Sequence, residues 1–405
     1  MPHGRQKTDT PRFLVTLEAG IGDAVAMGLS AIDQIIANDP TATGTIDVLC
    51  NDLQAQIFAC DPRVNRIIQT SKVFCPSPRV SQWLRGITLD AQAAHVAQFL
   101  KQRHYEAIFP SSLAPGLYFR LRSRLMYPSL PVLARDFFAL RRLDDVPIGT
   151  VARKMVNHYF KYPASQMATG HEILLYISSA HVQKAMNTMA DLKIKKEAAA
   201  MPRDCMMLLV APDTTSAVTR PPVALLATAL SASLERNPRL VVCVLPGYTD
   251  TTCAANLHNI LSQRFAGRVF LLPAEPKAGL LELAALIDQF ALFVSGDTGV
   301  MHLAVAHKKL REGDNKRFSP GNKTKVIALF GGTNPGYFGY SQRSVIIGRG
   351  RKEQRAFRPG IAKVAYDTKN RDLFDHISPR QLADAICSVL PIDDTTGQLE
   401  SMLQQ

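Results

Sequence analysis

The sequence is 405 residues long, with 46% hydrophobic residues, 20% charged residues and a formal net charge of +13. This length allows two or three domains, and the composition is that of an ordinary soluble globular protein. The apolar runs are too short for a membrane-spanning helix and residues 1–11 are polar, unlike a signal peptide, so we expect a cytoplasmic protein.

Seven cysteines are scattered along the chain without a Cys-x-x-Cys pair, which argues against a disulfide framework or a structural zinc site. The excess positive charge lies mainly in residues 307–325 and 349–363, each with a net charge of +5. Neither segment interleaves aromatic residues as a platform for nucleic-acid bases does. Both are either solvated loops or binding surfaces; for 307–325 we expect contact with an anionic membrane surface or a protein.

Apolar strands alternate with helices along the first half of the chain. Strands are expected at 13–17, 45–50, 64–69 and 105–109, and helices at 23–37 and 180–192. Residues 113–143, rich in Arg and Pro, are expected to form loops and short helices at a cleft. This alternation predicts βαβ units around a parallel sheet.

A second alternating series follows a segment rich in charge, alanine and proline. Its strands are expected at 206–210, 240–245, 269–272, 291–295 and 326–330, and its helices at 222–235 and 379–390. The α/β pattern predicts Rossmann-like domains at 1–195 and 206–390, a linker at 196–205 and a disordered tail at 391–405. Ligands are then expected beyond the carboxyl ends of the strands.

Between the first strand and the first helix lies the segment Glu18-Ala-Gly-Ile-Gly-Asp23. Its glycines allow close approach of a ligand, and the free N–H groups at a helix start favour anions. Val25 occupies the third glycine position of the dinucleotide-binding motif, which argues against a nicotinamide-dependent oxidoreductase. Asp23 is either stabilised by the helix dipole alone or is a functional carboxylate.

A second strand-to-helix corner contains Asp297-Thr-Gly299, with His302 one helical turn further on. Its hydroxyl and backbone N–H groups would suit a diphosphate, although capping and a core histidine are the structural alternatives. Two further loops carry Thr214, Thr215 and Arg220, and Asp250. The first three suit phosphate oxygens, and an acid at a strand end suits a ribose hydroxyl.

Together these segments resemble glycosyltransferase family 9, the lipopolysaccharide heptosyltransferases, across nearly the whole chain. The resemblance rests on G-I-G-D, on T-T…R-P-P, on S-G-D-T-G-V-M-H-L-A followed by I-A-L-F-G-G-T-N-P, and on His376-Ile-Ser-Pro379. It implies a GT-B fold, in which two Rossmann-like domains face each other across a cleft. It also implies inverting sugar transfer, with heptose from ADP-heptose and a lipopolysaccharide-core glycan as acceptor, without metal or cofactor.

The resemblance also assigns roles to single residues. Asp23 matches the family's catalytic base, and the N-terminal domain would hold the acceptor, with Gly22 beside it. The donor would be bound by the residues Thr214, Thr215, Arg220, Asp250, Asp297, Thr298, Gly299 and His302. Arg120, Arg122 and Arg124 are either ligands of an acidic acceptor or one exposed strand face.

The sequence departs from the family in the third segment, where Thr219 stands at the usual lysine and Pro221 at the usual tryptophan. A lost charge-assisted donor typically costs about 3 kcal/mol of transition-state stabilisation. Arg220 is the candidate replacement, and Asp250 stands at the usual glutamate. The alternatives are therefore another nucleotide-sugar donor in the same fold, or a binding or scaffold protein with weakened catalysis.

Overall fold

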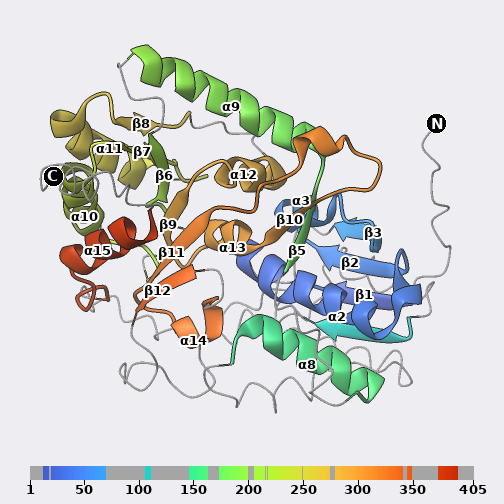
Figure 1. Cartoon of the computed structure of the whole chain (residues 1–405). Helices are drawn as coiled ribbons and strands as arrows, with labels where there is room; N and C mark the ends of the chain where they lie inside the picture. Colours follow the sequence, from blue (N-terminus) through green and yellow to red (C-terminus); the bar gives the residue numbers. More distant parts are fainter. Residues whose placement is uncertain are drawn as a thin grey trace, which may run out of the picture.

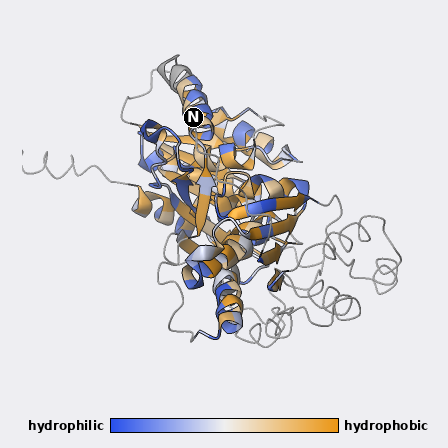
Figure 2. Cartoon of the chain, turned by 90° about the vertical axis from the view of Figure 1, so that its right-hand side faces the viewer, coloured by the Kyte–Doolittle hydropathy of each residue, from blue (hydrophilic) through white to orange (hydrophobic). Residues whose placement is uncertain are grey.

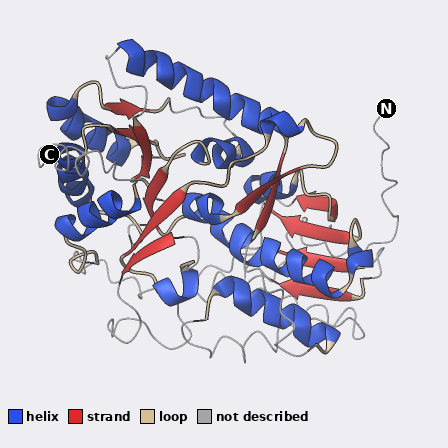
Figure 3. Ribbon diagram, in the orientation of Figure 1, coloured by secondary structure: helices blue, strands red, loops and turns tan. Residues whose placement is uncertain are grey.

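The computed structural model describes residues 12–17, 20–69, 105–110, 146–162, 173–198, 205–214, 216, 218–248, 250–273, 279–340, 344–348 and 373–390. Within these residues the strands form three sheets, and all strand pairs are parallel. The α/β class and the parallel pairing predicted from the alternation are confirmed (Figures 1 and 3). Residues 113–143, 349–363 and 391–405 lie outside the described part.

The first sheet belongs to the N-terminal half and has the strand order β3-β2-β1-β4. Its strands are β1 (Phe13–Thr16), β2 (Ile46–Cys50), β3 (Val64–Gln69) and β4 (Ala107–Pro110). Its helical segments are α1 (Ile21–Asp23), the π-helical turn η1 (Ala24–Leu29), α2 (Ser30–Asn38), the 3-10 turn η2 (Pro40–Ala42), α3 (Asp52–Phe58) and α8 (Ile148–Phe160). The single helix expected at 23–37 is therefore three consecutive segments.

The second sheet belongs to the C-terminal half and has the order β12-β11-β9-β6-β7-β8. Its strands are β6 (Met206–Ala211), β7 (Leu240–Val244), β8 (Val269–Leu271), β9 (Leu292–Gly296), β11 (Lys325–Phe330) and β12 (Ser344–Gly348). Its helices are α10 (Val223–Arg236), α11 (Thr252–Phe265), α12 (Leu280–Ile287), α13 (Gly299–Val305), α14 (Pro335–Phe338) and α15 (Pro379–Val389). With β6 as the first strand, this is the Rossmann order, in which the ligand crevice lies where the order reverses, between β6 and β9.

A third, two-stranded sheet was not expected from the sequence. β5 (Leu174–Ile177) pairs in parallel with β10 (His307–Leu310), so a strand that follows the N-terminal sheet pairs with one from the C-terminal half. The long helix α9 (Ser179–Ala198) leads away from β5 and packs against α12 (Figure 1). Because α9 continues to Ala198, the first residues of the expected linker are helical.

The two halves also share apolar packing. One hydrophobic cluster contains residues of the first sheet, such as Phe13 and Val48, together with Leu281 of α12 and Leu303 of α13. The strands are mainly hydrophobic (Figure 2), and helices such as α2, α8 and α10 add further buried apolar residues to the clusters. Elements of both halves therefore contribute side chains to one hydrophobic core. Burial of these side chains away from water stabilises the contact between the halves.

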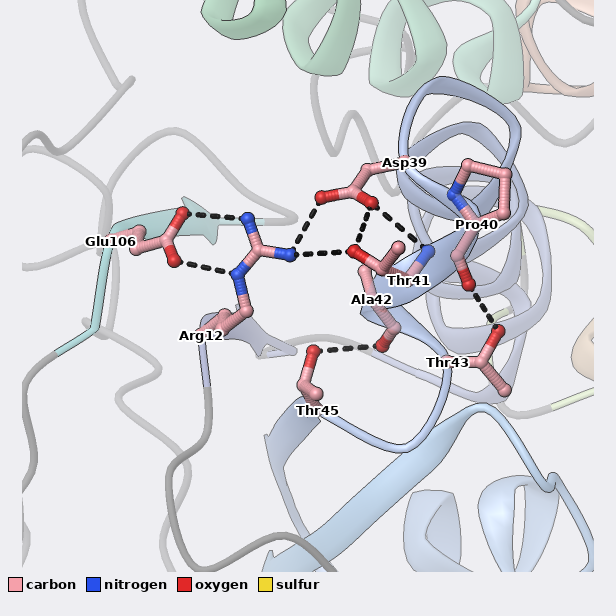
Figure 4. A network of polar contacts seen from close by, with 8 residues as sticks. All are labelled: Arg12, Asp39, Pro40, Thr41, Ala42, Thr43, Thr45 and Glu106. Atoms are coloured by element: carbon pink, nitrogen blue, oxygen red, sulfur yellow. Dashed lines mark hydrogen bonds and ion pairs between the residues drawn. The ribbon is translucent and has the colours of Figure 1, made fainter.

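Polar contacts close the amino ends of the first sheet. The Arg12 guanidinium donates to Glu106 Oε1 and to Asp39 Oδ2, both at 2.6 Å, and the Asp39 carboxylate caps η2 by accepting from the Thr41 N–H at 3.0 Å (Figure 4). These contacts join the entry to β1 with the end of α2 and the start of β4. They lie at the edge of the sheet opposite to the strand ends from which a ligand site is expected.

A second, buried ion network ties the same half together. Arg63 forms an ion pair with Asp61 at 2.6 Å and another with Asp33, and Arg153 of α8 approaches Asp33 at 3.4 Å. Arg63 also donates to the carbonyl of Leu174 in β5 at 3.3 Å. The four charged side chains are at most 8% exposed, so each depends on its partners for solvation.

The structure corrects the expectation for one residue of the basic segment 307–325. Lys308 is 2% exposed, and its ammonium donates to the carbonyl of Ala304 at 2.8 Å and lies 3.8 Å from Asp288 Oδ1. It holds the end of α13 and cannot contact a membrane. The other cations of the segment, Lys309, Arg311, Lys316, Arg317, Lys323 and Lys325, are exposed.

Candidate active site

The first corner of the site follows β1. Gly20 precedes α1, and its carbonyl accepts a hydrogen bond from the buried side chain of Gln54 at 3.2 Å. Gln54 in turn forms a capping box with Asn51 at the start of α3. Asp23 is the last residue of α1 and is half-buried. The side chain of Gln54 in α3 thus fixes the backbone of this corner at Gly20. The candidate base, Asp23, lies at the end of α1.

The second corner follows β9. The Thr298 hydroxyl accepts from the backbone N–H of Met301 at 3.3 Å and caps α13, which was the structural alternative for this residue. Asp297 is half-buried, and His302 is 4% exposed. Close packing also explains Gly296, because an added Cβ would lie 2.2 Å from the carbonyl oxygen of Thr219 in the neighbouring loop.

The two corners are in direct contact. A Cβ added at Gly22 would lie 2.7 Å from His302 Cδ2, and one added at Gly299 would lie 2.6 Å from the Cβ of Ile21. α1 therefore packs on α13. In the fold, α13 lies next to the N-terminal half (Figure 1). The structure brings Asp23 and His302, predicted from separate motifs, to the same place.

We expect Gly22→Ala to destabilise the protein by about 1–3 kcal/mol, because the new methyl group has no room unless the buried imidazole of His302 moves. Chemical denaturation measures this change in the free energy of unfolding. Gly20→Ala is the matched control, because a Cβ there meets nothing within 4 Å; its effect should stay within about 0.5 kcal/mol. Equal stability of the two variants would contradict the packing of Gly22 on His302.

His302 lies in a polar chain that links both sides of the site. Its Nε2 is 3.4 Å from Asp297 Oδ1, and its Nδ1 is 2.6 Å from the hydroxyl of Tyr340. Burial, together with the nearby carboxylates of Asp297 and Asp23, raises the pKa of Tyr340 well above its usual range. The four side chains thus form one electrostatically coupled group across the two corners.

The loops after β6 and β7 bring further predicted residues together. Arg220 donates to the carbonyl of Thr214 at 2.7 Å and lies 3.5 Å from Asp250 Oδ2. A hydrogen bond from the backbone of Thr252, with further help from its side chain, lowers the pKa of Asp250. Thr219, at the position of the family lysine, is buried, and its hydroxyl donates to Thr214 Oγ1 at 3.2 Å. Thr219 therefore shapes the loop and supplies no cation.

Some predicted site residues lie outside the described part of the chain. These are Thr215, Arg120, Arg122 and Arg124. Their roles stay predictions.

Sequence reasoning missed two residues of the site, Tyr340 and Asp213. The Asp213 carboxylate accepts from the backbone N–H groups of Gly247, Cys253 and Ala254 at 3.1–3.2 Å, so it fixes the β7 loop and the start of α11. An acid directly after a buried strand was the available signal for Asp213. Tyr340 had no such signal, because it is 38 residues from His302 in the chain.

The chain is similar to known proteins in a family model and in the fold of solved structures. Residues 188–362 match the model of glycosyltransferase family 9 (heptosyltransferase). A comparison with curated protein sequences gives no match. Among solved structures, the chain is similar to the family 9 glycosyltransferase of Veillonella parvula, with 13% identity, a TM-score of 0.59 and coverage of 95% of this chain and 98% of that one.

Two Escherichia coli structures are similar as well. They are ADP-heptose lipopolysaccharide heptosyltransferase II, with 15% identity, a TM-score of 0.57 and coverage of 93% and 98%, and heptosyltransferase WaaC with ADP, with 16% identity, a TM-score of 0.54 and coverage of 94% and 100%.

The fold is therefore that of a GT-B glycosyltransferase, as predicted. Residues 188–362 match the family 9 model, and this match confirms the family resemblance over these residues and the enzyme class stated from the motifs. No helix in the described part of the chain has the length and apolar character to cross a membrane.

Proposed function

We propose that this protein transfers a sugar, heptose from ADP-heptose, to a glycan acceptor of the lipopolysaccharide core, with inversion and without a metal or cofactor. The observation that supports the proposal is the contact of the two corners: Gly22 lies against His302, and the charge of Asp23 is near enough to act on Tyr340, the hydroxyl partner of His302. A general base and a group of hydrogen-bond donors at one point are what a displacement at an anomeric carbon requires.

In this mechanism Asp23 removes the proton of the acceptor hydroxyl as its oxygen attacks the anomeric carbon. The bond from that carbon to the diphosphate breaks, and the departing oxygen gains negative charge. Donors at the 297–299 turn, His302, and the hydroxyls of Thr214 and Thr215 stabilise that charge. Asp250 would hold the ribose of the nucleotide.

The loop after β6 supports binding of an anion. Arg220 Nε and Ser216 Oγ are buried and have no hydrogen-bond partner among the described residues. A buried donor without a partner costs about 1–3 kcal/mol, and a phosphate oxygen would satisfy it. Arg220 thereby takes the place of the cation lost at Thr219. The solved E. coli heptosyltransferases that are similar to this chain carry ADP and an ADP-heptose analogue, which favours ADP-heptose as donor.

The acceptor and the location belong to the same proposal. An anionic glycan or glycolipid at the cytoplasmic face of the inner membrane would meet the arginines at 120, 122 and 124. The exposed cations of the segment 307–325 support contact with that membrane surface or with a protein. A scaffold protein with weakened catalysis is the second candidate, and the buried Thr219 favours it.

A nucleotide panel tests the donor site. We expect ADP to raise the thermal stability more than UDP, GDP or NAD, since a ligand at a hundred times its Kd stabilises by about 2.7 kcal/mol. In Arg220→Gln the affinity for ADP should fall by roughly tenfold to a hundredfold, because a charged hydrogen bond is lost. The control is Arg264→Gln, an exposed arginine near the far end of α11.

The outcomes of the panel separate the candidates. Stabilisation by NAD alone would contradict a nucleotide-sugar site. Stabilisation by ADP without turnover of ADP-heptose, with a core glycan present, would favour the scaffold protein. Stronger stabilisation by UDP or GDP than by ADP would indicate a nucleotide-sugar donor other than ADP-heptose. The fold and the mechanism would then stay as proposed.

A further inference from the structure

The imidazole of His302 is enclosed by two polar groups that are not equivalent. Nε2 faces a carboxylate oxygen of Asp297 at 3.4 Å, and Nδ1 faces the hydroxyl of Tyr340 at 2.6 Å. A carboxylate can only accept a hydrogen bond, whereas a phenol can donate or accept. The identity of these partners therefore decides which nitrogen of a neutral imidazole carries the proton.

The carboxylate side requires the N–H group. If the proton were on Nδ1, the lone pair of Nε2 would face the oxygen of Asp297, and the two would repel each other. With the proton on Nε2, this nitrogen donates towards Asp297, and the lone pair of Nδ1 is left to accept. The hydroxyl of Tyr340 is in place to donate to it, and 2.6 Å is a short hydrogen bond.

Tyr340 is firmly held. Its carbonyl accepts from the backbone N–H of Ser344 at 3.0 Å and from the Ser344 hydroxyl at 2.6 Å. Its ring meets that of His302 edge to face, with centroids 5.4 Å apart, and packs against hydrophobic clusters of both halves. Since its pKa is raised well above the usual range, the hydroxyl keeps its proton at neutral pH and stays a donor.

We propose that Tyr340 is a positioning residue that holds His302 in the tautomer with its proton on Nε2, so that His302 acts in the reaction as a hydrogen-bond donor and not as a second base. The proposal rests on the proposed function for its consequence in catalysis, but the tautomer itself does not depend on it. A distance of 3.4 Å from Nε2 to Asp297 is long for a hydrogen bond. The N–H is thus available to a closer acceptor, such as an oxygen of the departing diphosphate, and Asp23 remains the base.

The test is a ¹⁵N spectrum of the histidine rings in the full chain, with His302 assigned from a His302→Gln variant. In the wild type we expect a protonated Nε2 and an unprotonated, hydrogen-bonded Nδ1. Tyr340→Phe keeps the ring and its packing but removes the donor, so the resonances of His302 should move as the second tautomer becomes populated. Tyr162→Phe, an exposed tyrosine at the end of α8, is the control and should leave them unchanged.

Kinetics add a second readout. In Tyr340→Phe we expect kcat with ADP-heptose to fall about tenfold while KM for the donor stays within about twofold, because the lost hydrogen bond orients His302 for the transition state. A purely structural tyrosine would change KM or stability instead. Tyr162→Phe should again match the wild type.

The possible failures are distinguishable. A wild-type His302 with its proton on Nδ1, or His302 resonances that Tyr340→Phe leaves unchanged, would overturn the role of Tyr340 whether or not the protein transfers sugar. A wild type that shows the expected tautomer but turns over no nucleotide-sugar would overturn the proposed function and leave the tautomer standing.

Discussion

Asp23→Asn is expected to lower kcat for sugar transfer by about a thousandfold, within the range that a general base contributes. Asparagine has nearly the same shape but cannot take the proton of the acceptor hydroxyl. The residue is half-buried at the end of α1, and the exchange removes a charge without opening a cavity. The measurement is the rate of product formation at saturating donor and acceptor.

The same variant should bind ADP with unchanged affinity, because the donor-binding groups belong to the second sheet. Thermal shift with ADP checks this, and it also shows that the variant is folded. Asp191→Asn, an exposed aspartate on α9, is the control for a lost negative charge. Transfer by Asp23→Asn at the rate of the control would remove Asp23 from the mechanism.

Arg63→Met should lower the free energy of unfolding by about 3–5 kcal/mol, the usual cost of removing one partner from a buried ion network. Asp33 and Asp61 would lose the guanidinium that pairs with both of them. The side chain also joins this network to the carbonyl of Leu174 in β5. Chemical denaturation at pH 7.5 measures the loss. Arg66→Met, an exposed arginine on β3, is the control and should stay within about 0.5 kcal/mol.

This loss should depend on pH. Burial raises the pKa of Asp33, although Arg63 and Arg153 act in the opposite direction. Without Arg63 the pKa rises further, so the folded variant binds a proton more strongly than the unfolded chain. Stability then increases as the pH falls through the folded pKa. We expect the deficit of Arg63→Met to be smaller at pH 5 than at pH 7.5. If the loss of stability in Arg63→Met instead became larger at low pH, Asp33 would not be the buried carboxylate that loses its partner.

The contact between the halves bears on how substrates enter. α1 lies on α13, β5 pairs with β10, and one hydrophobic cluster spans both halves. Gly22 leaves no space between itself and His302. In the proposed mechanism the sugar therefore reacts beside this contact, near the side chains of Asp23 and Asp297, or after the two corners have separated.

Local chemistry made much of this protein predictable. Runs of apolar residues placed the strands at 206–210 and 240–245 to within one residue, because strands in the middle of a covered parallel sheet are continuously apolar. Ser378 before Pro379 predicted the start of the last helix, and its hydroxyl does accept from Gln381 N–H at 3.0 Å. The two glycine-containing corners were likewise predicted from the sequence, since a close approach of the backbone to another group requires residues without a side chain.

What the tertiary structure decided involves partners that are distant in the chain. β5 and β10 are short and far apart in the chain, and although β5 is an apolar run, no local pattern predicts that the two strands pair with each other. From the sequence, Lys308 was expected to be a surface cation like its neighbours, but packing buries it against Asp288 and Ala304. Likewise, only the fold brings Tyr340 to His302, and with it the expected state of the imidazole. Local sequence determines which residues form a corner, whereas the packing of the two halves determines what each side chain meets.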